Sequence, residues 1–233
     1  AEVQLSTKDL VAPLFVREGI TERLASQAMV RLAGELAARY PDRLIVFDAP
    51  PVLAMSGAAA LAPLIGQVVL VVEASRQAGS VAALVRGTVA AFGALNIAAN
   101  IVGDAHRDAS GADFHEQSLE SWEYTQAVSL RSVFLSMKHE IAHMIEHGGG
   151  AICNVTSLAG LLYVGAAGAA YAASKAGVVR LTKFAAVSYA DRGVRVNCIA
   201  PGVTPTEAYN KAGREMGQMV IDHLLPNQPI KRV

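Results

Sequence analysis

The chain has 233 residues, a size that suits a single α/β domain. Hydrophobic residues make up 52% of it and charged residues only 17%, which indicates a large core and apolar surface for a partner subunit. Its 20 basic and 20 acidic residues cancel, so no nucleic-acid-binding surface is predicted. No apolar run reaches the ~18 residues of a membrane-spanning helix.

Cys153 and Cys198 are the only cysteines, and both lie in β-type runs. Isolated thiols of this kind favour a reducing compartment over a disulfide framework. The first residues lack the basic and apolar regions of a signal peptide. These features predict a cytoplasmic protein.

Short β-branched runs alternate along the chain with longer segments of helical periodicity. Helices and strands are predicted, in chain order, at residues 22–38 (helix), 44–47 (strand), 58–65 (helix), 68–72 (strand), 81–92 (helix), 96–100 (strand), 119–147 (helix), 151–156 (strand), 169–190 (helix) and 194–199 (strand). This alternation is typical of a parallel sheet with crossover helices. Right-handed crossovers then predict one Rossmann-like, doubly wound α/β domain over residues 1–233, a three-layer αβα sandwich with its ligand site beyond the carboxyl ends of the strands.

Three residues near those strand ends suit acid–base chemistry. Ser157 follows a strand, while Tyr171 opens a helix on which Lys175 lies four residues further on. This spacing puts the phenol and the ammonium on one helical face. The ammonium can lower the phenol pKa from its usual value of about 10, so that tyrosine can act as a general acid or base. Serine would hold the substrate oxygen, and hydride transfer would require a nicotinamide cofactor.

These residues lie within a longer series of landmarks. In chain order the landmarks are Phe92-Gly93-Ala94-Leu95, Val133-Phe134-Leu135, Gly150-Ala151-Ile152-Cys153-Asn154-Val155-Thr156-Ser157, Tyr171-Ala172-Ala173-Ser174-Lys175 and Val194-Arg195-Val196-Asn197-Cys198-Ile199-Ala200-Pro201-Gly202. With this order and spacing, residues 77–233 resemble the short-chain dehydrogenase/reductase family. The resemblance implies NAD(P)-dependent interconversion of an alcohol and a carbonyl compound by Ser157, Tyr171 and Lys175.

The resemblance also implies a cofactor site and a homodimer or homotetramer that buries the predicted helices 119–147 and 169–190. NAD or NADP would be contacted by Asn100, Gly103, Lys175, Pro201, Gly202 and Thr206. Two positions depart from the family pattern. Its Asn-Asn-Ala-Gly strand end reads Asn100-Ile101-Val102-Gly103, and Ser129 replaces the helix asparagine of its proton relay. Ser129 is therefore a candidate catalytic residue whose relay role is open.

The family's Gly-x-x-x-Gly-x-Gly turn, whose backbone binds the cofactor pyrophosphate, does not occur before Tyr171. Residues 1–76 instead resemble P-loop ATPases related to bacterial tyrosine kinases of exopolysaccharide synthesis. The stretches concerned are Leu24-Ala25-Ser26, Glu35-Leu36-Ala37-Ala38-Arg39-Tyr40-Pro41-Asp42-Arg43, Phe47-Asp48-Ala49-Pro50-Pro51-Val52-Leu53 and Gly66-Gln67-Val68-Val69-Leu70-Val71-Val72-Glu73-Ala74. Asp48 would be the Mg²⁺-organising carboxylate, but the phosphate loop is missing, so nucleotide hydrolysis is not predicted.

Two other functions are open. A chimera of natural, recombined or designed origin could be a catalytically inactive Rossmann-like scaffold, because a dinucleotide would lack backbone donors for its pyrophosphate. Alternatively, His139-Glu140-Ile141-Ala142-His143 matches the His-Glu-x-x-His pattern of zinc hydrolases, with His147 as a third ligand. The dehydrogenase interpretation is favoured, and it involves no metal.

Overall fold

The computed structural model of the chain describes residues 14–15, 30–31, 34–35, 38–39, 47–48, 69–72, 78–103, 113–164, 167–202 and 222. The chain divides into two compact units. One consists of Ala1–Val68 with Leu84–Leu95, and the other of Val69–Ala83 with Asn96–Val233. The expectation of one domain of hybrid origin stays a prediction.

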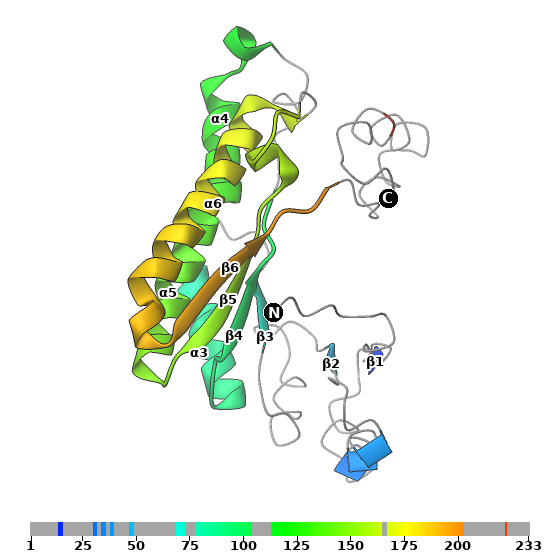
Figure 1. Cartoon of the computed structure of the whole chain (residues 1–233), viewed down its shortest axis with the longest axis vertical. Helices are drawn as coiled ribbons and strands as arrows, with labels where there is room; N and C mark the ends of the chain where they lie inside the picture. Colours follow the sequence, from blue (N-terminus) through cyan, green and yellow to red (C-terminus); the bar gives the residue numbers. More distant parts are fainter. Residues whose placement is uncertain are drawn as a thin grey trace. The chain divides into compact units, whose positions relative to one another are not determined.

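The second unit contains a four-stranded parallel sheet (Figure 1). Its strands, in spatial order, are β3 (Val69–Val72), β4 (Ile97–Asn100), β5 (Gly150–Val155) and β6 (Val194–Ile199). All four were predicted within one or two residues. β3 lies within residues 1–76, and it pairs in parallel with β4, which lies within residues 77–233. The predicted pairing of a strand before residue 77 with one after it is therefore present, and the separate origin of the two segments stays a prediction.

The first unit contains a small parallel pair formed by β1 (Leu14–Phe15) and β2 (Phe47–Asp48). The predicted strand at residues 44–47 overlaps β2 only at Phe47. β1 was not predicted, because two residues are too short to show an alternating pattern. Of the predicted helix 22–38, residues 30, 31, 34, 35 and 38 are described and helical. The predicted helix 58–65 lies outside the described residues.

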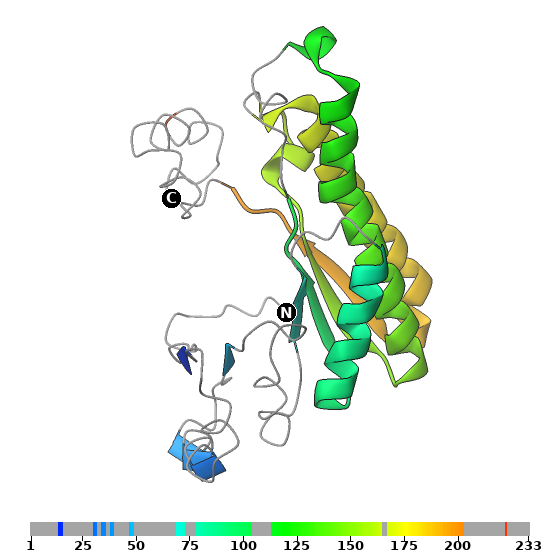
Figure 2. The same cartoon turned by 180° about the vertical axis from the view of Figure 1, so that it is seen from behind.

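The remaining elements complete the order along the chain. They are α3 (Ala78–Phe92), η3 (Phe114–Glu116), α4 (Leu119–Gln126), η4 (Ala127–Arg131), α5 (Ser132–Glu146), η5 (Leu158–Gly160), α6 (Ala169–Tyr189) and η7 (Ala190–Arg192). α5 and α6 lie side by side on one face of the sheet (Figure 2).

One long helix was predicted at residues 119–147, but the structure interrupts it. η4 is a π-helical turn between α4 and α5. A single π turn inside an α-helix is too short to be distinguished from the flanking α-helical turns by sequence periodicity. The Ser118 side chain caps the start of α4 by accepting a hydrogen bond from the Ser121 N–H at 3.1 Å.

The core of the second unit lies between the sheet and these helices. Val133, Met137, Ile141 and Met144 form a buried stripe at helical spacing on α5. On the strands, buried residues alternate with more accessible ones. In β5, for example, Ile152 and Asn154 are both buried and the residue between them is more accessible. Within the described part of the chain, no helix is long and apolar enough to cross a membrane. The cytoplasmic location stays a prediction.

Candidate active site

The side chain of Lys175 lies at the place where two parallel strands end. Its side chain is only 1% exposed. The ammonium donates hydrogen bonds to the carbonyl oxygen of Val155, at 3.0 Å, and to that of Val102. Val155 is the last residue of β5 and Val102 follows β4, so the two carbonyls meet at the same edge of the sheet. Burial lowers the pKa of this amine to about 8.

Tyr171 lies on the first turn of α6, one turn before Lys175. The lysine Nζ is 5.5 Å from the centroid of the tyrosine ring. Gly103 borders both groups, because a Cβ at this position would lie 2.9 Å from Nζ and 3.5 Å from the phenol oxygen. The structure therefore brings the predicted phenol, ammonium and Gly103 together. A side chain on Gly103 would occupy the space beside them.

Ser157 lies two residues after the end of β5 and caps the start of the short turn η5. Its Oγ accepts a hydrogen bond from the Ala159 N–H at 3.2 Å. The turn packs tightly against the backbone of α6, since a Cβ on Gly160 would come within 2.6 Å of the carbonyl carbon of Lys175. Thr156 adds a hydrogen bond from its Oγ1 to the Lys175 carbonyl oxygen at 2.7 Å. The turn that bears Ser157 is thus fixed against the lysine.

The Pro201 turn lies beside the serine turn. Leu158 N–H donates to the Pro201 carbonyl oxygen at 3.1 Å, and Thr156 N–H donates to that of Ile199 at 2.8 Å. Pro201 and the exposed Gly202 were both predicted to contact the cofactor. Thr206, the third predicted residue of this turn, lies outside the described residues.

The π turn η4 contains Ser129, which is fully buried. In the preceding helix, the Gln126 side chain donates to the Ala170 carbonyl oxygen at 2.9 Å, next to Tyr171 in sequence. This hydrogen bond ties the end of α4 to the start of α6. π turns inside helices occur frequently at functional sites. The catalytic role of Ser129 stays a prediction.

Asn100, like Lys175, is a predicted cofactor residue whose side chain is fully buried. Its Nδ2 donates to Glu140 Oε2 at 3.0 Å and to Asn154 Oδ1 at 2.9 Å. The amide therefore contacts the protein interior. The cofactor-binding role of Asn100 stays a prediction.

The geometry of the His-Glu-x-x-His segment does not favour a zinc site. Glu140 is fully buried, whereas His139 and His143 are half-buried. The rings of His143 and His147 are stacked, with centroids 4.0 Å apart and planes within 17°. Nearly parallel rings do not aim their nitrogen lone pairs at one ion. Burial, and secondarily His147, lower the pKa of His143. Over the described ranges, no group of three or more His, Cys, Asp or Glu residues could hold a metal.

Comparison with known proteins identifies the family. The sequence model of the family described as enoyl-(acyl carrier protein) reductase matches residues 32–233. The chain belongs to the short-chain dehydrogenase/reductase family. The match also covers residues 32–76, and the resemblance of residues 1–76 to P-loop ATPases stays a prediction.

Named relatives of this short-chain dehydrogenase/reductase chain include two curated enzymes. It is 42% identical over 128 residues to cis-4-hydroxycyclohexanecarboxylate dehydrogenase of Sinomonas cyclohexanicum. This match covers 54% of this chain and 49% of the relative. It is 40% identical over 127 residues to cyclohexanol dehydrogenase of Acinetobacter sp. (strain SE19). That match covers 53% of this chain and 48% of the relative. The chain therefore spans about half the length of the curated relatives it matches.

A solved structure, ElxO with NADP bound, resembles the chain with a TM-score of 0.61 and 21% identity. The similarity covers 91% of this chain and 81% of ElxO, and it shows the fold. Together with the parallel sheet and its flanking helices, it confirms the predicted Rossmann-like α/β fold class.

Sequence reasoning missed several groups that build the dehydrogenase-like site. The Val102 and Val155 carbonyls leave no side-chain signal, so the lysine's acceptors could not be inferred. Thr156 and Gly160 flank Ser157 closely in sequence, and that proximity was the available hint. The need for glycine at position 160 is a close approach to α6, which becomes visible only when the two backbones are placed together.

Proposed function

We propose that the protein interconverts an alcohol and a carbonyl compound with NAD or NADP, using Tyr171 as the general acid or base. The supporting observation is the meeting of the tyrosine hydroxyl, the Lys175 ammonium and Gly103 at the carboxyl edge of the sheet. In the oxidative direction Tyr171 accepts the hydroxyl proton of the alcohol, and in the reductive direction it returns one to the carbonyl oxygen. Ser157 holds that oxygen.

Lys175 supports this chemistry electrostatically. Its ammonium favours the phenolate and so lowers the phenol pKa towards neutrality. The bound nicotinamide would supply or take up the hydride. Gly103, Lys175, Pro201 and Gly202 would hold the cofactor. The bare backbone at Gly103 fits this role, because a Cβ there would fill the space beside the phenol and the ammonium.

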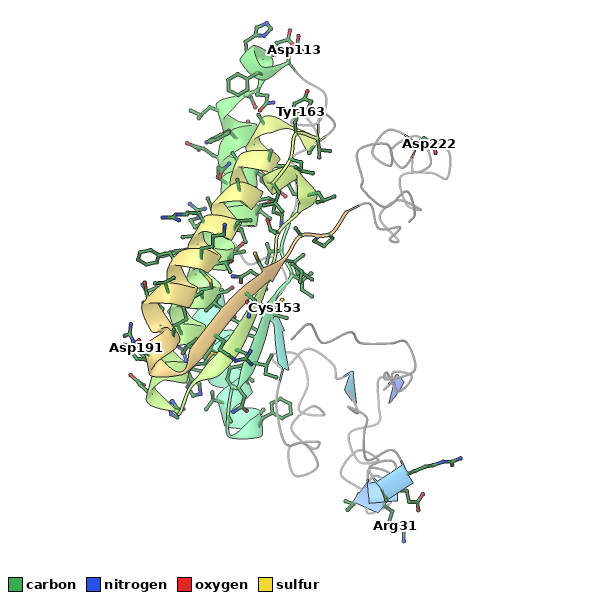
Figure 3. All side chains as sticks on the ribbon, viewed as in Figure 1. Arg31, Asp113, Cys153, Tyr163, Asp191 and Asp222 are labelled. Atoms are coloured by element: carbon green, nitrogen blue, oxygen red, sulfur yellow. The ribbon has the colours of Figure 1, made fainter. Side chains whose placement is uncertain are left out.

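We propose a secondary alcohol on a six-membered carbon ring as the substrate class. Two relatives are named for cyclohexane alcohols. The segment after Ser157 exposes Leu161, Leu162 and Tyr163, the last with 93% of its surface accessible (Figure 3). These side chains follow the serine in sequence and offer an apolar surface, which suits a carbocycle better than a polyhydroxylated substrate.

The test is a direct assay of the purified chain. Cyclohexanol and NAD or NADP should yield reduced nicotinamide, detected by its absorbance, and NADH or NADPH should bind with a change in fluorescence. An acyclic polyol of similar size should react more slowly. Failure of both reduced cofactors to bind at millimolar concentration would instead support the inactive scaffold.

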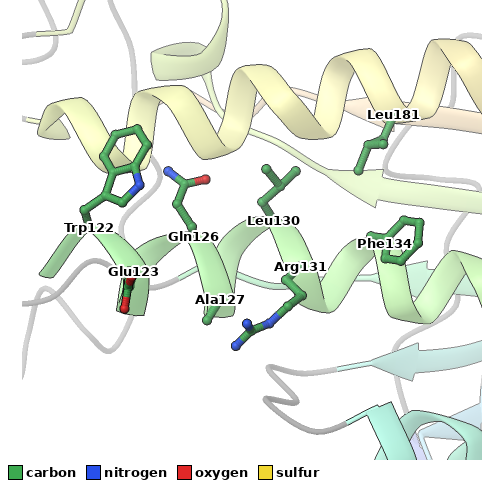
Figure 4. Close-up of a pocket in the computed structure, with 8 residues that line it drawn as sticks. All are labelled: Trp122, Glu123, Gln126, Ala127, Leu130, Arg131, Phe134 and Leu181. Carbon is green, nitrogen blue, oxygen red and sulfur yellow. The ribbon is translucent and has the colours of Figure 1, made fainter. Parts of the chain in front are cut away.

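We further propose that the protein is a homodimer or homotetramer built on the outer side of α4, α5 and α6. A groove of about 600 Å³ runs between these helices, lined by Trp122, Glu123, Gln126, Ala127, Leu130, Arg131, Phe134 and Leu181 (Figure 4). Phe134, which lines the groove, is exposed, and so are Phe184 and Val187 of α6. An exposed apolar surface of this kind suits a subunit contact.

A further inference from the structure

Glu140 belongs to a cluster of polar side chains between α5, α6 and the sheet. We call Glu140, Asn100, Asn154 and Thr182 the buried polar layer. All four are buried, and Glu140 is fully enclosed. Asn100 Nδ2 donates to Glu140 Oε2 at 3.0 Å and to Asn154 Oδ1 at 2.9 Å, while Asn154 Nδ2 donates to Thr182 Oγ1 at 2.9 Å. A charged carboxylate enclosed this way has no cationic partner among these groups.

Two oxygens of the layer have no hydrogen-bond partner: Asn100 Oδ1 and Glu140 Oε1. Both are acceptors if Glu140 is ionised, and buried acceptors without donors are strongly unfavourable. A single proton on Glu140 Oε1 would remove both deficits, because the acid O–H would donate to Asn100 Oδ1. Since Asn100 already donates to the other carboxyl oxygen, the acid and the amide would form a closed ring of two hydrogen bonds.

We propose that Glu140 is a neutral carboxylic acid in the folded protein, paired with the Asn100 amide, and that it acts as a positioning residue for Lys175. Asn100 lies two residues before Val102, and Asn154 lies immediately before Val155. The carbonyls of Val102 and Val155 hold the lysine ammonium. The acid–amide pair therefore fixes the two strand ends on which the ammonium rests.

The surrounding groups are consistent with a neutral acid. β4 carries no titratable side chain, and strand alternation puts Cys153 of β5 and Arg195 of β6 on the opposite face from the buried polar layer. On the same face as the layer, β6 carries Cys198, which pairs in register with Asn154. On α5 and α6, Lys138, Glu146, Arg180 and Lys183 are exposed, and His139, His143, Tyr171 and Tyr189 are half-buried. The Nζ of Lys175 is hydrogen-bonded to the two carbonyls. Burial raises the pKa of Glu140 to about 7, although the Asn100 hydrogen bond lowers it.

The proposal fixes the sign of a pH effect. The carboxyl group has a pKa of 4.5 as its ordinary value and about 7 when folded. Between these values the folded protein holds a proton that the unfolded chain releases. The contribution of Glu140 to the free energy of unfolding is therefore complete below the lower value, and it is lost as the pH rises through about 7.

The experiment compares Glu140→Gln, Glu140→Leu and a control, Glu146→Gln, on the exposed part of the same helix. Glutamine can donate to Asn100 Oδ1 and accept from its Nδ2, so it reproduces the neutral acid without titrating. At about pH 6 the infrared spectrum of the wild type should show the carbonyl band of a protonated, buried carboxyl group. Glu140→Gln should lose this band, and Glu146→Gln should keep it. A wild-type spectrum with no band sensitive to Glu140→Gln would overturn the neutral acid.

Thermal unfolding from about pH 5 to pH 9 gives a second measure. Glu140→Gln should gain stability relative to the wild type as the pH rises, and a difference independent of pH would contradict the proposal. Positioning is tested by the rate at which an amine-reactive reagent modifies Lys175, read by peptide mass spectrometry. Glu140→Leu should raise this rate several-fold and Glu140→Gln should restore it. Equal rates in the two variants would overturn the positioning role.

The role of Glu140 in positioning Lys175 for catalysis rests on the proposed function. The infrared, unfolding and lysine-modification measurements need no cofactor. A wild type that binds no NADH or NADPH would therefore refute the dehydrogenase proposal and leave the Glu140 measurements decisive. Where cofactor binds, its affinity should be unchanged in Glu140→Gln and weakened in Glu140→Leu.

Discussion

Each side of α6 contains residues that the usual amphipathic pattern would place on the other side. On the side facing the sheet, Lys175 and Thr182 are buried together with Val178. On the outer side, Phe184 and Val187 are 64% and 82% exposed. The buried side thus contains polar anchors, and the exposed side contains large apolar groups.

The difference shows that one helix serves two purposes. Every buried polar anchor on its inner side has a defined partner, such as the two carbonyls for Lys175 and the Asn154 amide for Thr182. Such anchoring holds the first turn, and with it Tyr171, at the strand ends. The outer side has the composition of a subunit contact. Substitutions on the inner side should therefore change chemistry, and those on the outer side should change association.

Tyr171→Phe should have the largest effect on turnover. It removes the hydroxyl group that acts as the general acid or base but keeps the aromatic ring, so the rate of alcohol oxidation should fall by about 10²–10⁴-fold. Thermal unfolding should be nearly unchanged, since the volume is conserved. Tyr189→Phe, at the other end of the same helix, is the matched control and should retain full activity. Full dehydrogenase activity in Tyr171→Phe would remove the proposed acid–base role.

Lys175→Met should reduce both cofactor affinity and rate. The loss of a charge-assisted hydrogen bond of about 1.5–3 kcal/mol corresponds to about 10–100-fold. Lys183→Met, on the exposed side of α6, is the control and should have little effect. If Lys183→Met were equally damaging, the loss could not be assigned to the buried ammonium.

Lys175→Met also tests the lowered pKa of Lys175. Burial lowers it from 10.5 to about 8, so between these values the unfolded chain binds more protons than the folded protein. The free energy of unfolding should therefore rise with pH across this window in the wild type. Lys175→Met should lack that rise, which denaturant titrations at several pH values would measure. An identical slope in both proteins would contradict the shifted pKa.

Gly160→Ala should have a smaller effect, caused by steric overlap. The added Cβ would approach the backbone carbonyl carbon of Lys175 and the nitrogen of Ala176 at 2.6 and 2.7 Å. Backbone atoms cannot rotate away as a flexible side chain can, so a destabilisation of about 1–3 kcal/mol is expected. Turnover should fall because the Ser157 turn moves. Gly34→Ala, where nothing lies within 4 Å, is the control; comparable stability losses in both would exclude the overlap as the cause.

The sequence predicted the parts of the fold that depend on periodicity. β6 was readable because Val194 and Val196 alternate with exposed residues, and the Tyr171–Lys175 pair was readable because four residues make about one helical turn. β1 was not readable, since two residues show no period. The π turn at 127–131 was hidden because one such turn between two α-helices has no sequence period of its own.

The site was predictable only where chemistry resides in side chains. Tyr171 and Lys175 were identified correctly as neighbours, whereas the carbonyls that bind the lysine and the close approach at Gly160 depend on tertiary packing. Glu140 shows the reverse problem. Its neighbours in sequence suggested a zinc ligand set, but helix geometry places the carboxyl group in the core, whereas both histidines are only half-buried. A linear motif does not reveal which side of a helix is buried.

The smallest effect on chemistry is expected for the double substitution Phe184→Ser and Val187→Ser on the outer side of α6. Both side chains are largely exposed in the single chain, so the fold of each subunit should change little. A dimer that buries them would lose much of its apolar contact, because burial of one large apolar side chain is worth about 1.5–3 kcal/mol. Sedimentation at micromolar concentration should then show an oligomer for the wild type and a monomer for the variant. Leu161→Ser with Leu162→Ser is the matched control, because it removes exposed apolar groups that follow Ser157 in sequence and should leave the assembly intact. A wild type that sediments as a monomer would refute the oligomer, and a variant that remains fully assembled would place the subunit contact elsewhere.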